Sequence, residues 1–347
     1  MILFIAPYPN EYNEKDGMIQ RIAAIDNLVA DCDRKYLEIS FRKYWFLKKE
    51  KKSINLTVLK LNFFVYFFLI LWFILKAKVI YVHSIYNSLK ILPFYFMKDV
   101  ITDIHGVVPE ELKDDGKIIQ SYIYQFVEKI VAKHSEYLIV VTTAMKKHFL
   151  IKYQDIKAIF LMIPIFDETV INISLGKYSD RISVIYAGGV QKWQNVDKML
   201  LAIKQVQQNV QYIILSGNQE IFKEKLKTYG IVNNVLLNSV PKEEVYSYYA
   251  KADLGFVLRE NNIVNRVACP TKLIEYMSYG VVPIVLQPDI GDFFEYGYSY
   301  VLLEDFLLGK LPSSDEFERM RNNNFSIIKN VKTLVNNDLH KLLRRMV

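Results

Sequence analysis

Short apolar runs alternate with segments of helical periodicity along most of the chain. Eight runs have the length and the β-branched or aromatic content of buried strands: 1–7, 78–84, 99–106, 137–143, 182–189, 211–218, 252–258 and 281–287. Segments with apolar residues three and four positions apart lie between them, among them 16–30, 120–135, 196–208 and 242–252. Continuous apolar strands that alternate with helices are typical of parallel sheets covered on both faces.

The alternation breaks around Pro164 to Gly176 and restarts at Ile182. A chain of 347 residues has the length of about two ordinary domains. We therefore predict an α/β protein with two doubly wound, Rossmann-like domains that face a cleft. The predicted boundaries are 1–165 and 177–325, followed by a helical segment, 326–347, that packs back on the first domain. Sites in such folds lie beyond the carboxyl ends of the strands.

One apolar segment departs from this rhythm. Leu61–Leu75 is apolar or aromatic except for Asn62, and it lies between Lys60 and Lys76. At a rise of about 1.5 Å per residue it reaches roughly 22 Å, short of the roughly 30 Å hydrocarbon core of a bilayer. Apolarity all round also disfavours a half-exposed helix. We expect either a buried helix or one partly sunk in a bilayer surface.

The formal net charge of +7 is concentrated in the first half of the chain, where residues 1–165 hold 23 Lys or Arg against 17 Asp or Glu. Much of the excess lies in Phe41–Lys52, a basic run with interleaved aromatic residues. Such a run suits nucleic acid, anionic lipid or only water. Cys32 and Cys269 are too few and too far apart for a disulfide framework or a thiolate metal site. With no signal-peptide pattern after Met1, we expect a cytoplasmic location.

Glycines follow two of the predicted strands in the second domain. Gly188 and Gly189 end the run 182–189, and Gly217 ends the run 211–218. Glycine at the end of a strand allows a ligand to approach the backbone. A tight turn from strand to helix explains each glycine equally well.

The stretch Asn265–Leu286 carries more information. Pro270 and Thr271 predict the start of a helix, whose first N–H groups suit a phosphate. Lys272 lies in the first turn, and Glu275 lies one turn from the predicted anion site, where a carboxylate accepts both hydroxyls of a ribose. Phosphate and ribose together indicate a nucleotide. A surface pair between Glu275 and Lys272 is the alternative.

These segments resemble the donor domain of retaining GT-B glycosyltransferases of the family-four, or group 1, type. The resemblance rests on three segments: 269–285 ("CPTKLIEYMSYGVVPIV"), 186–200 ("YAGGVQKWQNVDKML") and 290–297 ("IGDFFEYG"). It implies two Rossmann-like domains, a nucleotide-activated sugar as donor, ribose binding by Glu275, and no metal or other cofactor. It points towards the enzymes that build bacterial capsule, O-antigen and exopolysaccharide.

The sequence also departs from that family. The first of its two usual acidic residues falls at Val267, and its usual phosphate-binding Arg and Lys fall at Gly189 and Gln194. We expect Lys192, Arg266 and Lys272 to compensate, because a departing diphosphate needs cations where no metal is bound. Loss of activity is the alternative.

The first domain resembles the family at two loops, in "KDGMIQR" at 15–21 and "DIHGVVPEE" at 103–111. The resemblance makes His105 a candidate for sugar binding or for orienting the acceptor hydroxyl, with Gly106 beside it. A structural histidine that caps a turn is the alternative. Gly17 is placed to bring backbone N–H groups to a diphosphate. Glu110 and Glu111 suit acceptor contacts or a solvated helix start.

The sequence and the resemblance together predict a retaining glycosyltransferase. It transfers a sugar from a nucleotide-sugar donor to a hydroxyl of a glycan or lipid-linked glycan in cell-surface polysaccharide synthesis. Lys192, Arg266 and helix N-termini stabilise the leaving diphosphate. Peripheral attachment to the inner face of the membrane is expected, and no nucleic acid partner. The remaining histidines have no metal-ligand spacing, so no metal site is predicted: His83, His134, His148 and His340.

Two other functions stay open. A nucleotide-sugar epimerase on the same scaffold needs its own acid–base groups, for which His105 is the one candidate. A noncatalytic subunit of a glycosyltransferase complex needs no such groups.

Overall fold

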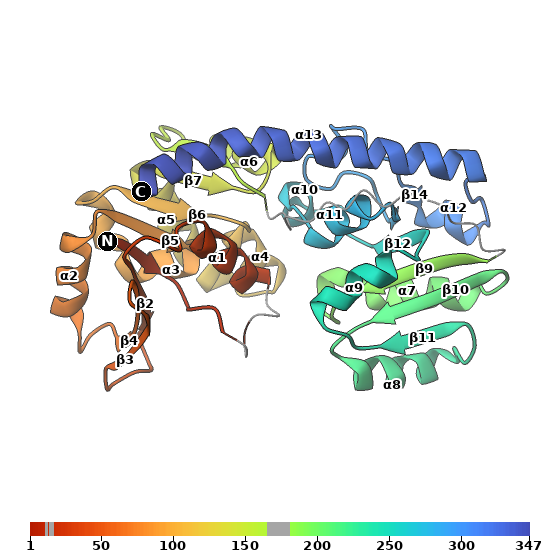
Figure 1. The fold of residues 1–347 in the computed structure, drawn as a ribbon, viewed down its shortest axis with the longest axis horizontal. Helices are drawn as coiled ribbons and strands as arrows, with labels where there is room; N and C mark the ends of the chain where they lie inside the picture. The colour runs from red at the N-terminus through yellow and green to blue at the C-terminus, as the bar shows by residue number, and fades with distance from the viewer. Residues whose placement is uncertain (11–12, 14–16, 165–180) are drawn as a thin grey trace. The chain divides into compact units, whose positions relative to one another are not determined.

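The computed structural model describes residues 1–10, 13, 17–164 and 181–347. The predicted junction from Pro164 to Gly176 lies outside these residues apart from Pro164 itself. The chain divides into two compact units, the first comprising Met1–Ile165 and Val335–Val347 and the second Phe166–Leu334. Each unit is built around its own sheet (Figure 1).

The first unit contains an eight-stranded sheet in the order β3-β4-β2-β1-β5-β6-β7-β8. All neighbouring strands are parallel except β3, which is antiparallel to β4. The strands are β1 (Ile2–Ile5), β2 (Arg34–Ser40), β3 (Lys48–Ser53), β4 (Leu56–Asn62), β5 (Val79–His83), β6 (Val100–Asp103), β7 (Tyr137–Val140) and β8 (Ile159–Met162). Neighbouring aromatic residues fill the centre of the sheet, where Phe4 pairs with Tyr36 on one side and Tyr81 on the other.

Helices connect most of these strands, but none lies between β2, β3 and β4 in this described part of the chain. They are α1 (Gly17–Leu28), α2 (Phe67–Lys76), α3 (Ser84–Ser88), the 3-10 helix η1 (Leu89–Phe96), α4 (Val108–Asp114), α5 (Ile118–His134) and α6 (Thr143–Lys152). The strand order runs outwards from β1 in one direction to β2 and β4, and then in the other direction through β5 to β8. Because crossovers between parallel strands are right-handed, helices of the two halves cover opposite faces of the sheet. The order therefore reverses between β1 and β5.

The apolar segment Leu61–Leu75 does not form a buried helix, which was one of the two expectations from its composition. Asn62 ends strand β4, and helix α2 begins only at Phe67. Three of its side chains are buried, namely Ile70, Phe73 and Ile74. Phe68 is 82% exposed and Trp72 is 45% exposed, so the helix is half-exposed although it is apolar all round. Among the described residues, no helix is long and apolar enough to cross a membrane.

The second unit contains a six-stranded sheet in the order β11-β10-β9-β12-β13-β14, with every neighbouring pair parallel. Its strands are β9 (Ile182–Ala187), β10 (Val210–Leu215), β11 (Val235–Asn238), β12 (Leu254–Val257), β13 (Val282–Val285) and β14 (Val301–Leu302). Its helices are η2 (Lys192–Gln194), α7 (Val196–Gln205), α8 (Gln219–Tyr229), α9 (Lys242–Tyr249), α10 (Ile263–Val267), α11 (Thr271–Ser278) and α12 (Leu303–Leu307). Here the strand order reverses between β9 and β12.

The last helix, α13 (Ser314–Met346), contributes to both units. In the second unit its Arg321, 3% exposed, pairs with Asp253 at 2.6 Å. In the first unit its Arg345 binds the Glu136 carboxylate with Nε 2.8 Å from each oxygen. The residues that group with the first unit are Val335–Val347, the last part of the helical segment predicted at 326–347.

Candidate functional site

In the second unit, the carboxyl ends of β9 and β12 lie next to each other at the reversal of strand order. A reversal opens a crevice at the sheet edge because the two neighbouring strands send their chains to opposite faces. Gly188 directly follows β9, and Arg259 lies two residues beyond β12. Helix α11 follows β12 in the chain and starts at Thr271, with Pro270 at its N-cap.

The Lys272 side chain is buried at this crevice. Its Nζ donates a hydrogen bond to Gln194 Oε1 at 3.0 Å and lies 3.8 Å from the centre of the Tyr186 ring. A Cβ atom at position 188 would lie only 2.7 Å from that Nζ. Gly188 therefore makes room for the ammonium group of Lys272. The side chain also reaches Gln194, the position that aligns with the family's usual lysine.

Arg259 is a second cation at this site, and it was not among the residues predicted from the sequence. Burial lowers the pKa of Arg259 to about 10. Burial also holds the pKa of Lys272 well below its usual value, and the nearby charge of Arg259 lowers it further. Among the described residues, no carboxylate lies within 4.0 Å of either side chain. We call Lys272 and Arg259 the cation pair.

The start of α11 adds to this positive potential. Pro270 supplies no side-chain cap, and the first N–H groups of a helix have no acceptor within the helix. Together with the helix dipole they attract an anion. Two partly desolvated cations without an anionic partner, at a helix N-terminus and a topological switch point, form a site suited to a phosphate group.

Glu275 lies one turn further along α11. Its Oε2 accepts a hydrogen bond from the hydroxyl of Tyr249 at 2.9 Å. Tyr249 belongs to α9 and is 1% exposed, so its hydroxyl holds the carboxylate in a fixed orientation. Glu275 also raises the pKa of Lys272, but the two side chains do not form an ion pair. The surface pair considered as the alternative is therefore not formed.

Tyr276 fixes α11 against the sheet. Its hydroxyl donates to the Ile185 carbonyl at 3.3 Å and accepts from the Ala187 N–H at 3.2 Å. Its ring lies over Gly255 in β12, where a Cβ atom would approach the ring to 2.3 Å. The helix that carries Lys272 and Glu275 is thus tied to both strands that flank the crevice.

The other predicted residues of the second unit are less closely connected to this site. Lys192 and Arg266 are exposed, and their side chains make no hydrogen bond or ion pair within the described part of the chain. The Gly189 carbonyl accepts a hydrogen bond from the Tyr186 hydroxyl. Gly217 is exposed, with open space where a side chain would lie.

In the first unit, a buried charge pair lies at the end of β6. Arg21 of α1 binds Asp103 with Nε 2.8 Å from both carboxylate oxygens and Nη2 2.7 Å from Oδ1. The Tyr81 hydroxyl also donates to Asp103. Burial opposes the charge, but the Arg21 guanidinium holds the pKa of Asp103 well below its usual range. Arg21 ends the "KDGMIQR" segment, which therefore contributes a side chain as well as Gly17, the exposed first residue of α1.

His105 lies two residues beyond this aspartate. Its ring stacks on that of His83, with centroids 4.4 Å apart. Burial lowers the pKa of His105 to about 3, and the neighbouring His83 and Arg21 contribute to this shift. His105 is therefore neutral at physiological pH. Its Nδ1 has no hydrogen-bond partner within the described part of the chain, although the atom is buried.

The sequence spacing gave no indication that His83 belongs with this group. Ligand atoms of His83, Asp103 and His105 nevertheless lie within 4.8 Å of one another, a spacing that a metal ion can bridge. The chemistry of the three does not favour a metal. Both oxygens of Asp103 are already engaged by Arg21, whose positive charge repels a cation. We interpret the group as a histidine pair held beside a buried charge pair.

Gly106, Glu110 and Glu111 also make close contacts in the first unit. A Cβ atom at position 106 would lie 2.3 Å from Oε1 of Glu111. Burial, together with the charge of Glu110, raises the pKa of Glu111 to about 7. Glu110 instead pairs with Lys152 at 2.7 Å and His148 at 3.1 Å. Although burial opposes it, these contacts hold the pKa of Glu110 at about 2, so a solvated helix start does not describe either residue.

Residues 167–291 match the family model "Glycosyl transferases group 1". This part of the chain is a glycosyltransferase domain. The match contains Gly188, both members of the cation pair and Glu275, and it confirms the predicted enzyme class. No curated protein matches the chain in sequence.

Solved structures resemble the whole chain in fold. Sucrose-phosphate synthase from Thermosynechococcus elongatus is 11% identical with a TM-score of 0.68, and the match covers 99% of this chain and 98% of that one. The Anabaena protein HepE, in complex with UDP and glucose, is 14% identical with a TM-score of 0.69 and covers 98% of each chain. Trehalose 6-phosphate synthase from Burkholderia multivorans is 11% identical with a TM-score of 0.66, covering 99% and 97%. The predicted GT-B fold is confirmed.

Proposed function

We propose that this glycosyltransferase takes its sugar from a nucleotide-sugar donor and transfers it, with retention of configuration, to a hydroxyl of a glycan or lipid-linked glycan in cell-surface polysaccharide synthesis. The observation that carries the proposal is the cation pair without an anionic partner. A diphosphate supplies two adjacent negative charges, which suit Lys272 and Arg259. HepE, which shares the fold, is seen in complexes with UDP-glucose and with UDP and glucose.

The donor is assigned to the second unit. The cation pair and the first N–H groups of α11 would bind the diphosphate, while Glu275, oriented by Tyr249, would accept the ribose hydroxyls. As the bond from the anomeric carbon to the diphosphate breaks, negative charge grows on the departing oxygen. Preorganised cations stabilise that charge, and such stabilisation is a large part of catalysis in many enzymes. Lys192 and Arg266 are expected to approach the same phosphates.

The acceptor is assigned to the first unit. The acceptor hydroxyl oxygen forms the new bond to the anomeric carbon, and its proton passes to the departing diphosphate. A neutral His105, with its unpartnered Nδ1, suits a hydrogen bond to a sugar hydroxyl. Burial keeps the histidine neutral, and of the nearby charges Arg21 lowers its pKa while Asp103 raises it. The charge pair of Arg21 and Asp103 takes no part in the transfer. Retention is the outcome that the resemblance of residues 269–285 implies.

Acceptor-dependent release of nucleotide tests this function. The purified protein would be incubated with a panel of sugar nucleotides, with and without a mixture of glycan and lipid-linked acceptors. A transferase releases nucleoside diphosphate in proportion to product, and only with acceptor. An epimerase would change the sugar and release no nucleotide. A noncatalytic subunit would do neither, and either outcome would overturn the proposal.

We further propose that the first unit binds the surface of anionic membranes. The basic run Phe41–Lys52 and the start of α2 form one surface, because the Tyr66 hydroxyl accepts from the Leu47 N–H at 2.8 Å and donates to the Trp45 carbonyl at 3.3 Å. Large side chains stand exposed on it: Trp45 at 60%, Phe46 at 86%, Phe64 at 67% and Phe68 at 82%.

Lysines flank these aromatic residues. Lys48, Lys49, Lys51 and Lys52 all lie on the exposed edge strand β3. Lysines on an edge strand also prevent pairing with other chains, which is the simpler explanation for the charges alone. It does not explain the exposed aromatic residues beside them. Cations attract anionic lipid at about 1 kcal/mol each, and aromatic side chains favour the membrane interface.

Sedimentation with vesicles tests this attachment. A variant with Gln at Lys48, Lys49, Lys51 and Lys52 should sediment less with anionic vesicles than the parent. Its transfer to a lipid-borne acceptor should be slower, while its transfer to a short soluble acceptor should be unchanged. A control variant carries Gln at four exposed lysines elsewhere in the first unit: Lys113, Lys117, Lys129 and Lys146. Phe68→Ser should weaken binding at all salt concentrations. Equal sedimentation of the two quadruple variants would show that the basic run is only a solvated edge.

A further inference from the structure

A cavity of about 340 Å³ lies in the first unit, at the reversal of strand order between β1 and β5. Residues at the carboxyl ends of β1, β2 and β5 line it, together with α1, α3 and η1. Its volume is within the range of small-ligand sites, which starts at about 300 Å³. The cavity therefore occupies the position at which a doubly wound sheet binds ligands.

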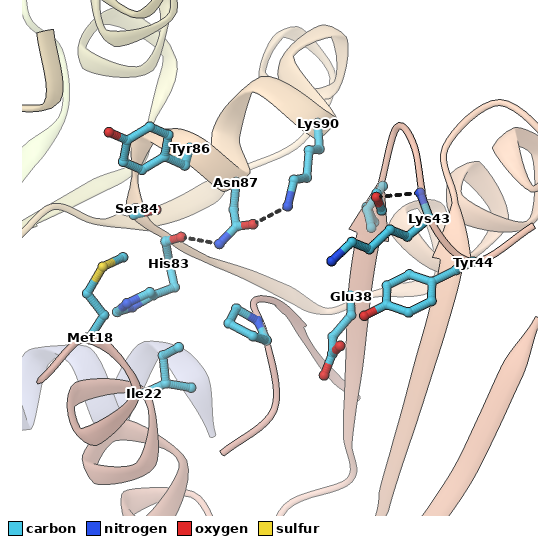
Figure 2. Close-up of a pocket in the computed structure, with 13 residues that line it drawn as sticks. Met18, Ile22, Glu38, Lys43, Tyr44, His83, Ser84, Tyr86, Asn87 and Lys90 are labelled. Carbon is cyan, nitrogen blue, oxygen red and sulfur yellow. Dashed lines mark hydrogen bonds between the residues drawn. The ribbon is translucent and has the colours of Figure 1, made fainter. Parts of the chain in front are cut away.

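Two lysines face this cavity (Figure 2). Lys90 is half-buried, and its Nζ donates to Asn87 Oδ1 at 2.7 Å. Asn87 in turn donates from Nδ2 to the His83 carbonyl at 2.7 Å, which fixes the amide with its oxygen towards the lysine. Lys43 reaches in from the loop after β2. Within the described residues, neither ammonium group forms an ion pair.

One carboxylate lines the cavity, and it is already balanced. Glu38 Oε1 accepts a hydrogen bond from the Tyr8 N–H at 2.9 Å, and Oε2 lies 3.6 Å from Lys60 Nζ. Its negative charge thus offsets the positive charge of Lys60, and the positive charges of Lys43 and Lys90 are not offset by a carboxylate of the cavity. Burial lowers the pKa of Lys90, against the opposing effect of Glu38. An ammonium group that loses water and gains no counter-ion is stabilised when an anion binds.

The remaining walls suit a sugar. The Tyr44 ring lies along one side with its hydroxyl towards Glu38, and Met18 and Ile22 provide apolar contacts on the opposite side (Figure 2). His83 belongs to the lining, and its ring stacks on that of His105. The cavity therefore adjoins the histidine assigned to the acceptor hydroxyl.

We propose that this cavity binds an acidic acceptor, a sugar that carries a phosphate or carboxylate group held by Lys43 and Lys90. Asn87 and Glu38 are placed for its hydroxyl groups. The inference rests on the proposed function, because it assigns the acceptor of that transfer to this cavity, and it narrows the acceptor to an anionic class. Binding of the acceptor in this cavity does not require a bound donor.

Acceptor binding can be measured without any sugar nucleotide. Calorimetry with the full chain would compare glucose 6-phosphate, glucuronate, inorganic phosphate and glucose. We expect at least one anionic sugar to bind tenfold or more tightly than glucose, with affinity that falls as salt is added. Glucose 6-phosphate and glucuronate distinguish a phosphate site from a carboxylate site, and phosphate alone shows whether the sugar contributes.

Variants assign the binding to the cavity. Lys90→Gln and Lys43→Gln should each weaken binding of the anionic sugar at least fivefold. The double variant should bind the anionic sugar no more tightly than glucose. Lys90→Arg keeps the charge and should retain most of the affinity, which separates a lost contact from a lost fold. Lys129→Gln removes one positive charge at an exposed position on α5, and its affinity for the anionic sugar should stay within twofold of the parent's.

Three results would overturn the inference: equal affinity for glucose and the anionic sugars, no binding of any anionic probe at 10 mM, or parental affinity in the double variant. Failure of the proposed function would look different. In that case no sugar nucleotide would be consumed with any acceptor, whereas calorimetry would still detect binding of the anionic sugar.

Discussion

Glu275 is the residue on which nucleotide recognition depends most directly in this account. Replacing Glu275 by Ala should weaken binding of the nucleotide by about 2–3 kcal/mol, the scale of charge-assisted hydrogen bonds. Stability should change little, because the carboxylate is half-buried and lies on α11 outside the apolar face that packs on the sheet. Calorimetry checks the affinity, with Glu224→Ala on the exposed face of α8 as the matched control. Affinity within twofold of the parent would remove Glu275 from the site.

Glu111 gives a prediction that depends on pH. Its pKa is raised to about 7 in the folded protein, so between pH 4.5 and 7 the folded state binds more protons than the unfolded state, and stability falls as pH rises. Glu111→Gln removes this cost. The variant should exceed the parent by about 3 kcal/mol in the free energy of unfolding at pH 8 and match it near pH 4.5, since each pKa unit corresponds to about 1.4 kcal/mol.

Glu110→Gln is the control, with the opposite sign. The pKa of Glu110 is held at about 2, so its charge stabilises the fold above pH 4.5 and is lost as pH falls from there towards 2. This variant should be less stable than the parent at pH 8. Urea unfolding at both pH values measures the differences, and a Glu111→Gln variant no more stable than the parent at pH 8 would contradict the assignment.

At the residue scale, the sequence predicts site residues where a local pattern exists. The helix start at Pro270 and Thr271 could be inferred from the chain, and Lys272 and Glu275 with it. Arg259 could have been found because it follows the strand 252–258, at the edge where such folds bind ligands. The side chains that contact Glu275 and His105, namely Tyr249 and His83, could not be predicted, because they come from other elements that only the folded chain brings close.

At the element scale, the position of α11 depends on Gly255 in β12. A Cβ atom there would lie 2.3 Å from the buried Tyr276 ring, so Gly255→Ala forces the helix away from the strand. We expect a loss of about 1–3 kcal/mol in stability, typical of overpacking, and weaker nucleotide binding because Lys272 and Glu275 move with the helix. Thermal unfolding measures the first effect. Gly217→Ala, which meets open space, should unfold like the parent. Equal stability of the two variants would contradict this view of the packing.

Strands were predictable mainly where apolar residues predominate, although β8, which is apolar ("IFLM"), was not predicted. The eight apolar runs correspond to β1, β5, β6, β7, β9, β10, β12 and β13. Strands β2 and β3 carry several charged residues, and β4 carries Lys60. In β3, "KKEKKS", the charges follow from its place at the edge of the sheet, where side chains reach water. The last residues of β4, Leu61 and Asn62, also belong to the apolar segment Leu61–Leu75, so the end of the strand and the start of the helix could not be separated by periodicity.

At the scale of the whole molecule, the two units repeat one arrangement with different chemistry. Each is a doubly wound sheet with a reversal of strand order, between β1 and β5 in the first and between β9 and β12 in the second. Both reversals hold lysine side chains without a carboxylate partner among the described residues. The sequence predicted this architecture from its alternation, but it gave no sign of the cavity with Lys43 and Lys90, which come from separate segments.

The central claim is that the cation pair binds the diphosphate of the donor. Comparing the affinities for a nucleoside diphosphate and its monophosphate tests this claim most directly. Calorimetry would compare the nucleoside diphosphate that stabilises the protein most, among UDP, GDP, ADP and dTDP, with its monophosphate. We predict that the diphosphate binds at least tenfold more tightly, and that Lys272→Met and Arg259→Gln each lose most of that preference, whereas Arg319→Gln on the exposed face of α13 keeps it. Lys272→Met should also unfold at a higher temperature without nucleotide, because it removes a buried ammonium group. An unchanged diphosphate preference in both variants would contradict the account.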